Sequence, residues 1–147
     1  PGQQLYRIIP KTILHIKLGK KVPLHGGGHS VRSFIHIKDV SDATLRAARN
    51  AVPGEIYHFS TARNIAISEL VRLICGLMGA DFSDVVEISE DRPGKDQAYL
   101  LDSSKAMAHL GWKDRIGLEQ GIEETIGWVC DNLEVLKTLP FDYIHKP

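Results

Sequence analysis

The sequence predicts an α/β fold in which several helices alternate with short strands. Two observations support this prediction. Apolar residues recur at the i, i+3, i+4 spacing of helices in several segments, and short apolar runs bounded by turn residues lie between them. The chain has 147 residues, of which 43% are hydrophobic, enough for one domain with a packed core.

The first half is expected to open with a helix that starts near Ile8, because Pro10 is tolerated only in a first turn. Gly19 is expected to end that helix. The elements expected next are a strand at 22–25, a glycine-rich loop at 26–30, a strand at 32–37, a helix to Asn50 capped by Asp39 or Ser41, a turn at Pro53-Gly54, and a strand at 56–59.

In the second half, Ser68 is expected to cap a helix that Gly79 ends. The elements expected beyond it are strands near 85–88 and 99–101, a short helix from Ser103 or Ser104 to Leu110, and a last helix at about 119–133. The tail is apolar, so we expect it to pack on another part of the protein.

Composition excludes several classes of function. Eighteen basic and eighteen acidic side chains give no net charge, which argues against a nucleic-acid partner. No apolar run approaches the ~20 residues of a membrane span, so no membrane partner is expected. Cys75 and Cys130 fall on apolar helix faces and predict buried free thiols of a cytoplasmic protein. The histidines lack the spacing of metal ligands, so no metal site is expected.

The segment 91–96, Asp-Arg-Pro-Gly-Lys-Asp, is the most distinctive part of the chain. Pro93 and Gly94 predict a tight turn. Arg92 and Lys95 on such a turn suit the oxygens of a phosphate group. The alternative is a solvated loop whose charges cancel.

Three motifs carry a resemblance to a known family. They are the Asp91–Asp96 segment with the later D-x-S-K-A and L-G-W residues, the run from Gly26 to Val40, and Gly54-Glu55-Ile56-Tyr57-His58. Their order resembles the C-terminal lobe of dTDP-glucose 4,6-dehydratases, members of the extended short-chain dehydrogenase/reductase superfamily. The resemblance covers nearly the whole chain.

The resemblance implies a nucleotide-sugar-binding C-terminal domain over 1–147, with a small mixed sheet, several helices and the Rossmann domain missing. The only glycine cluster has Val31 where the third glycine of G-x-G-x-x-G belongs, and no tyrosine stands four residues before a lysine. We therefore expect no catalytic residue in this chain. NAD is expected only on the missing domain.

The resemblance also implies a set of substrate-binding residues. Arg32 and Arg92 would bind the diphosphate with Asp91 and Lys95 beside them; on residues alone, a surface arginine that pairs with Asp39 or Glu55 is the favoured interpretation of Arg32. Arg7 would lie close to the substrate. Around the nucleotide the expected residues are Pro23, Leu24, His25 and His58, where His25 replaces the family's Tyr and His58 its Asn.

By resemblance, the whole enzyme is an NAD-dependent nucleotide-sugar 4,6-dehydratase, a cytoplasmic lyase of carbohydrate biosynthesis that binds a nucleotide-diphosphate sugar and forms a homodimer through the missing domain. One alternative is a nucleotide-sugar 4-epimerase or decarboxylase of the same superfamily. Another is a non-catalytic nucleotide-sugar binding module.

Overall fold

A computed structural model of the chain describes residues 1–91, 94 and 96–141. The chain divides into two compact units. The first contains residues 1–29, 67–95 and 122–147, and the second contains residues 30–66 and 96–121. The α/β class with small mixed sheets and several helices is confirmed.

Helix α1 (Ile8–Lys17) opens the first unit, and its limits follow from local chemistry. Pro10 lies in its first turn, as predicted. Gly19 takes a left-handed φ of 62° just after the helix, and the Lys20 N–H then donates to the His15 carbonyl at 2.9 Å. The predicted start and end of this helix are therefore confirmed.

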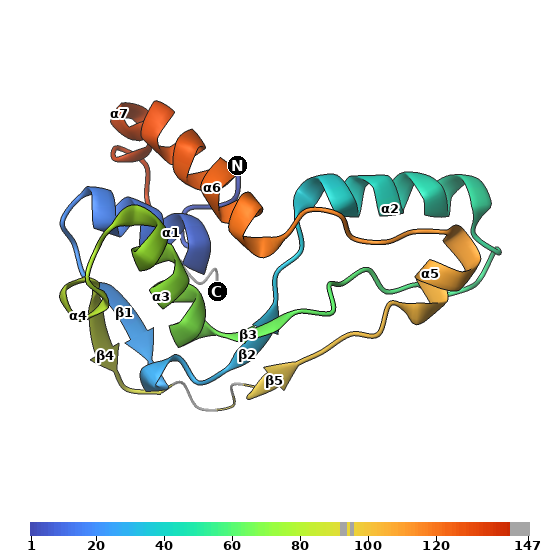
Figure 1. The fold of residues 1–147 in the computed structure, drawn as a ribbon, viewed down its shortest axis with the longest axis horizontal. Coiled ribbons are helices and arrows are strands. Elements are labelled where there is room, and N and C mark those ends of the chain that lie inside the picture. The colour runs from blue at the N-terminus through green and yellow to red at the C-terminus, as the bar shows by residue number, and fades with distance from the viewer. Residues whose placement is uncertain (92–93, 95, 142–147) are drawn as a thin grey trace. The chain divides into compact units, whose positions relative to one another are not determined.

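The first unit is built on a parallel pair of strands, β1 (Val22–His25) and β4 (Val86–Ser89), in which His25 is paired with Ser89. Helices α3 (Ile67–Met78) and α4 (Phe82–Val85) precede β4, and α1 and α3 pack beside the pair (Figure 1). The buried core of this unit is formed by Val22, Leu24, Val71, Cys75 and Val85.

The C-terminal part of the chain also contributes to the first unit. Helix α6 (Leu118–Asp131) enters it at Ile122, and the short helix α7 (Leu133–Leu136) follows. The Phe141 ring lies 5.6 Å from the His15 ring of α1, measured between centroids. The expectation that the tail packs on the protein is confirmed for Leu136 and Phe141; residues 142–147 lie outside the described part of the chain.

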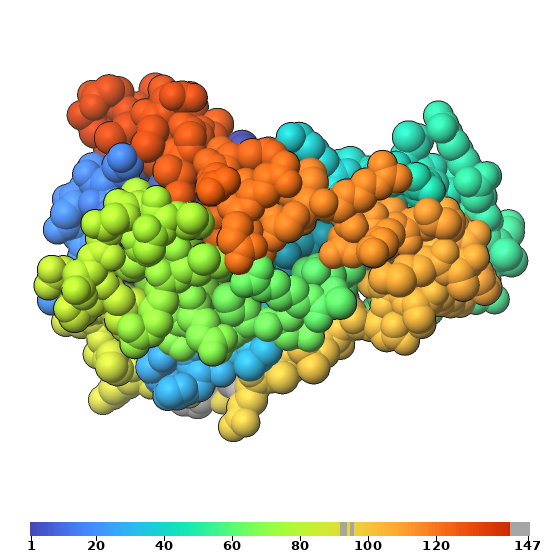
Figure 2. Space-filling view, viewed as in Figure 1, coloured from blue at the N-terminus to red at the C-terminus, as the bar shows by residue number. Residues whose placement is uncertain are grey.

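The second unit contains a three-stranded sheet in the order β3-β2-β5. Strand β2 (Val31–Ser33) is antiparallel to β3 (Asn64–Ala66) and parallel to β5 (Ala98–Tyr99). Helices α2 (Ile37–Asn50) and α5 (Ser104–Leu110) pack together, and Figure 2 shows them as adjoining parts of the surface, α2 in blue-green and α5 in light orange. Ala43, Ala106, Leu110 and Trp112 form the buried core of this unit.

Several local expectations are wrong. Ser68 does not cap α3, because that helix begins at Ile67 and Ser68 lies within it. The strand expected at 32–37 stops at Ser33, because the chain turns into α2 at Ile37. The segment 56–59 forms no strand, and Tyr57 and Phe59 instead pack against the core of the second unit. Helix α2 is capped by His36, whose Nδ1 accepts the Lys38 N–H at 3.2 Å, and not by Asp39 or Ser41.

The two cysteines differ in environment. Cys75 is 2% exposed, and burial raises the pKa of its thiol, so this prediction is confirmed. Cys130 is exposed, which corrects the expectation of a buried thiol. Within residues 1–91, 94 and 96–141, no helix is long and apolar enough to cross a membrane, and no group of three or more His, Cys, Asp or Glu residues is placed to hold a metal ion.

Candidate functional site

The C-terminal ends of β1 and β4 form the first part of the candidate site. His25 ends β1, and its Nδ1 lies 2.9 Å from the Ser89 hydroxyl and 3.3 Å from the Glu90 carbonyl oxygen. The Glu90 carbonyl oxygen can only accept, whereas the Ser89 hydroxyl can donate or accept, so the role of Nδ1 depends on the tautomer of the ring. Ligands of parallel sheets commonly bind beyond the carboxyl ends of the strands.

A loop of three glycines follows β1 directly. Gly26, Gly27 and Gly28 all have positive φ, at 57°, 67° and 72°. A Cβ atom at Gly26 would lie 2.4 Å from Cγ of Asp91. The loop backbone therefore passes directly against the Asp91 side chain, and this contact brings two of the sequence motifs together within the first unit.

Arg32 lies on β2 of the second unit, half-buried. Its guanidinium donates to the Val31 carbonyl at 2.7 Å and to the Asp96 carbonyl at 2.8 Å. Neither Asp39 nor Glu55, the alternative partners expected from the sequence, pairs with Arg32. Asp39 accepts backbone N–H groups and Glu55 pairs with Lys105. Within the described residues, the Arg32 charge thus meets backbone carbonyls and no acidic side chain.

The remaining predicted residues have different environments. Arg7 is exposed before α1, with its guanidinium carbon 5.3 Å from the centroid of the Tyr6 ring. Pro23 is half-buried, whereas the Leu24 side chain is 3% exposed and belongs to the core, so any contact of Leu24 with a nucleotide would come from its backbone. Arg92 and Lys95 lie outside the described residues.

His58 is exposed in the second unit. It lies close enough to Asp102 for its charge to affect that carboxyl. The Ser104 N–H and the Ser104 hydroxyl are the main groups that hold the pKa of Asp102 below its usual range, and His58 adds to the effect. These contacts fix Asp102 at the start of α5.

The predicted residues are divided between the two units. Those of the first unit are Arg7, Pro23, Leu24, His25 and Asp91, and those of the second are Arg32 and His58. The structure brings His25, Asp91 and the glycine loop together in the first unit. A common site for Arg32, Arg92 and Lys95 stays a prediction.

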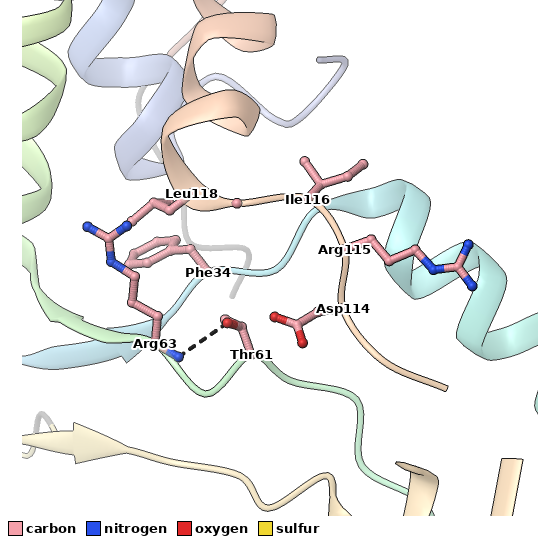
Figure 3. Close-up of a pocket in the computed structure, with 8 residues that line it drawn as sticks. Phe34, Thr61, Arg63, Asp114, Arg115, Ile116 and Leu118 are labelled. Atoms are coloured by element: carbon pink, nitrogen blue, oxygen red, sulfur yellow. Dashed lines mark hydrogen bonds between the residues drawn. The ribbon is translucent and has the colours of Figure 1, made fainter. Parts of the chain in front are cut away.

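A pocket of about 190 Å³ in the second unit was not anticipated from the sequence. It lies between the 61–63 segment and the 114–118 segment, with Phe34 on a third side (Figure 3). The Arg63 guanidinium donates to both carboxylate oxygens of Glu119, at 2.7 and 2.6 Å, which lowers the pKa of Glu119. No local signal marked this pocket, because its walls come from three segments distant in sequence.

Comparisons with known proteins agree with the motifs. The family model for GDP-mannose 4,6 dehydratase matches residues 2–125. The trifunctional UDP-glucose 4,6-dehydratase/UDP-4-keto-6-deoxy-D-glucose 3,5-epimerase/UDP-4-keto-L-rhamnose-reductase RHM2 of Arabidopsis thaliana is 36% identical over 134 residues, which cover 91% of this chain and 20% of that protein.

Two solved structures are also similar. The dTDP-glucose 4,6-dehydratase of Bacillus anthracis in complex with NAD has a TM-score of 0.89 and 30% identity, with 95% of this chain and 44% of that chain covered. The UDP-glucose 4-epimerase of Thermotoga maritima with UDP-glucose has a TM-score of 0.79 and 26% identity, with 86% and 40% covered. The chain spans less than half the length of these relatives. It belongs to the GDP-mannose 4,6-dehydratase family of the extended short-chain dehydrogenase/reductases and resembles the C-terminal part of dTDP-glucose 4,6-dehydratases.

Proposed function

We propose that this chain binds a nucleotide-diphosphate sugar as the substrate-binding part of an NAD-dependent nucleotide-sugar 4,6-dehydratase. The observation that carries the proposal is the meeting of His25, the glycine loop and Asp91 at the ends of two parallel strands. Asp91 is the first residue of the Asp-Arg-Pro-Gly-Lys-Asp segment, and its side chain lies against Gly26 of the loop. The segment then supplies cations for a diphosphate.

Arg32 is the second source of positive charge in this proposal. Its two hydrogen bonds to carbonyl oxygens orient the guanidinium without neutralising it. Arginine forms charge-assisted hydrogen bonds to phosphate oxygens through several parallel donors. Binding of the diphosphate would hold the sugar in position. The binding energy of the diphosphate, which is remote from the reacting atoms, is then used to orient the sugar.

The residues present do not fit an NAD site. A dinucleotide-binding loop connects a strand to a helix, whose N-terminus faces the pyrophosphate. Here the glycines Gly26–Gly28 follow β1 but lead into β2. We therefore derive no step of the reaction from this chain and assign NAD to another part of the protein. The cytoplasmic location and the homodimer also remain predictions.

The test is the affinity of the full-length protein for UDP-glucose and dTDP-glucose, measured by calorimetry with and without the Arg32→Ala substitution. We expect this change to weaken binding by about 1.5–3 kcal/mol, the usual contribution of a hydrogen bond to a charged group. The matched control is Arg49→Ala, which removes an exposed arginine from α2 of the same unit and should leave affinity unchanged. Equal affinities for the Arg32 variant and the wild type would contradict the proposal.

A 4-epimerase is the second candidate function, favoured by the similarity to the Thermotoga maritima UDP-glucose 4-epimerase. Product analysis separates the two candidates. A dehydratase converts the bound sugar to a 4-keto-6-deoxy product, whereas an epimerase returns a sugar of the same mass with inverted C4. A protein that binds the sugar and forms neither product is the non-catalytic binding module.

A further inference from the structure

We propose that the pocket of the second unit is a binding site for a small organic cation, such as a primary ammonium on a short apolar stem. The side chains and backbone on which the argument depends are those of Phe34, Thr61, Arg63, Asp114, Ile116 and Gly117. None of the residues that line the pocket is assigned to the nucleotide-diphosphate sugar, so this inference goes beyond the proposed function.

Asp114 supplies the negative charge of the site. Its side chain is half-buried and points into the pocket toward Thr61 (Figure 3). Within the described residues it has no hydrogen bond or ion pair. A partly buried carboxylate of this kind gains most from a ligand that carries positive charge and several N–H donors, because such hydrogen bonds are charge-assisted.

The two arginines of the pocket wall do not cancel this charge. The guanidinium of Arg63 is held by both oxygens of Glu119, at 2.6 and 2.7 Å. The side chain of Arg115 is exposed and points away from Asp114, toward α2 (Figure 3). Among the described residues, Asp114 is therefore the carboxylate of the pocket wall that no cation pairs with, and this favours a cationic ligand.

Apolar and polar groups complete the walls. The Phe34 ring lies on the side opposite Asp114, so an ammonium group between them would also meet an aromatic surface, a known source of cation binding (Figure 3). The Thr61 hydroxyl accepts the Arg63 backbone N–H at 3.2 Å, which leaves its own proton to donate. Ile116 contributes the aliphatic surface that would contact the stem.

The pocket has the size for a ligand of this class. Its volume is about 190 Å³, and a cavity of about 150 Å³ is known to bind benzene. Gly117 also lines the pocket, and a Cβ atom there would meet nothing within 4 Å. The wall is also held in place, since Asp39 accepts the N–H groups of Arg115 and Ile116 at 3.1 and 3.0 Å.

The experiment is a methyl NMR titration of the full-length protein, observing the δ1 methyl group of Ile116, with that of Ile74 in the other unit as an internal reference. The probes are n-butylammonium, n-butanol and butyrate, which share a stem and differ in charge. We expect butylammonium to shift the Ile116 signal in a saturable way, at millimolar concentration because the ligand is small. Butanol should bind at least about tenfold more weakly, and butyrate should not bind.

Two substitutions test the assigned groups. Asp114→Asn keeps the shape of the side chain and removes its charge, and we expect it to weaken butylammonium binding about tenfold or more. Gly117→Val adds a branched side chain to a residue that lines the pocket and should weaken binding. The matched control is Asp131→Asn, an exposed carboxylate at the end of α6, which should change nothing.

Three outcomes would overturn the proposal: no saturable shift up to roughly 100 mM butylammonium, equal binding of butanol and butylammonium, or unchanged binding by the Asp114→Asn protein. UDP-glucose affinity, measured on the same wild-type sample, reports separately on the proposed function. The two proposals can therefore fail separately, because the affinity for UDP-glucose does not depend on whether the pocket binds a cation.

Discussion

At the scale of single residues, Asp39 organises the second unit. It is 5% exposed, and its carboxylate accepts the N–H groups of Arg115 and Ile116 at 3.1 and 3.0 Å. Its backbone carbonyl accepts the indole N–H of Trp112 at 3.0 Å. These three bonds attach the segment after α5 to the first turn of α2. Sequence reasoning treated Asp39 as a helix cap or a partner of Arg32, and the structure gives it neither role.

We expect Asp39→Ala to lower the free energy of unfolding by about 2–4 kcal/mol, because two partly buried N–H groups would lose their acceptor. The comparison is Asp42→Ala on the same helix. Asp42 pairs with Arg46 at 2.9 Å near the surface, so its removal should cost at most about 1 kcal/mol. Urea denaturation of both variants measures the difference. Similar losses for the two would show that Asp39 contributes no more than a surface ion pair.

At the scale of elements, the parallel pairing of β1 with β4 determines where the candidate site lies. The two strands are separated by about sixty residues of chain, and residues 30–66 of the second unit lie between them in sequence. Their pairing places the glycine loop after β1 against Asp91, which follows β4. The conformation of that loop is therefore expected to matter for binding as well as for stability.

We expect Gly26→Ala to impair nucleotide-sugar binding, because the new Cβ would lie 2.4 Å from Cγ of Asp91 and would force the Asp91 side chain to move. Gly79→Ala is the matched control. Its φ of 66° is close to the 57° of Gly26, but nothing lies within 4 Å of the Cβ position. Both variants should lose about 1–2 kcal/mol of stability from the left-handed backbone, and only Gly26→Ala should weaken UDP-glucose binding. Equal affinities for the two variants would remove Gly26 and Asp91 from the site.

At the scale of the whole molecule, the chain carries motifs that resemble those of nucleotide-sugar 4,6-dehydratases and no motif for hydride transfer. Neither a usable G-x-G-x-x-G nor a Tyr four residues before a Lys occurs in it. Its similarity to the relatives also covers less than half of each of them. Binding and catalysis are thus expected to depend on different parts of the polypeptide.

We expect a polypeptide of these 147 residues to bind no NAD and to form no 4-keto product. The assay incubates a preparation that circular dichroism shows to be folded with NAD and nucleotide-glucose substrates, and then measures the ultraviolet absorbance of the product in alkali. The Bacillus anthracis dTDP-glucose 4,6-dehydratase serves as the positive control. Turnover by the 147-residue polypeptide would contradict this prediction.

The sequence by itself determined the elements whose signals are local. The apolar spacing, Pro10 and Gly19 defined α1, and Gly79 ended α3 as expected. The strand β1 was predicted at its observed limits, and the motifs around Arg32 and Asp91 indicated the family before any comparison. These predictions succeeded because helix periodicity, capping and turn chemistry act over a few residues.

Only the tertiary structure decided the features that depend on distant residues. Tyr57 and Phe59 have a strand-like pattern, yet the segment forms no strand. Both side chains pack against the core of the second unit, because burial there outweighs strand propensity. The contact of Gly26 with Asp91, the three bonds of Asp39 and the pocket at Asp114 each join segments far apart in the chain. Propensity and spacing describe neighbours along the chain, whereas these contacts arise only when separate segments pack together.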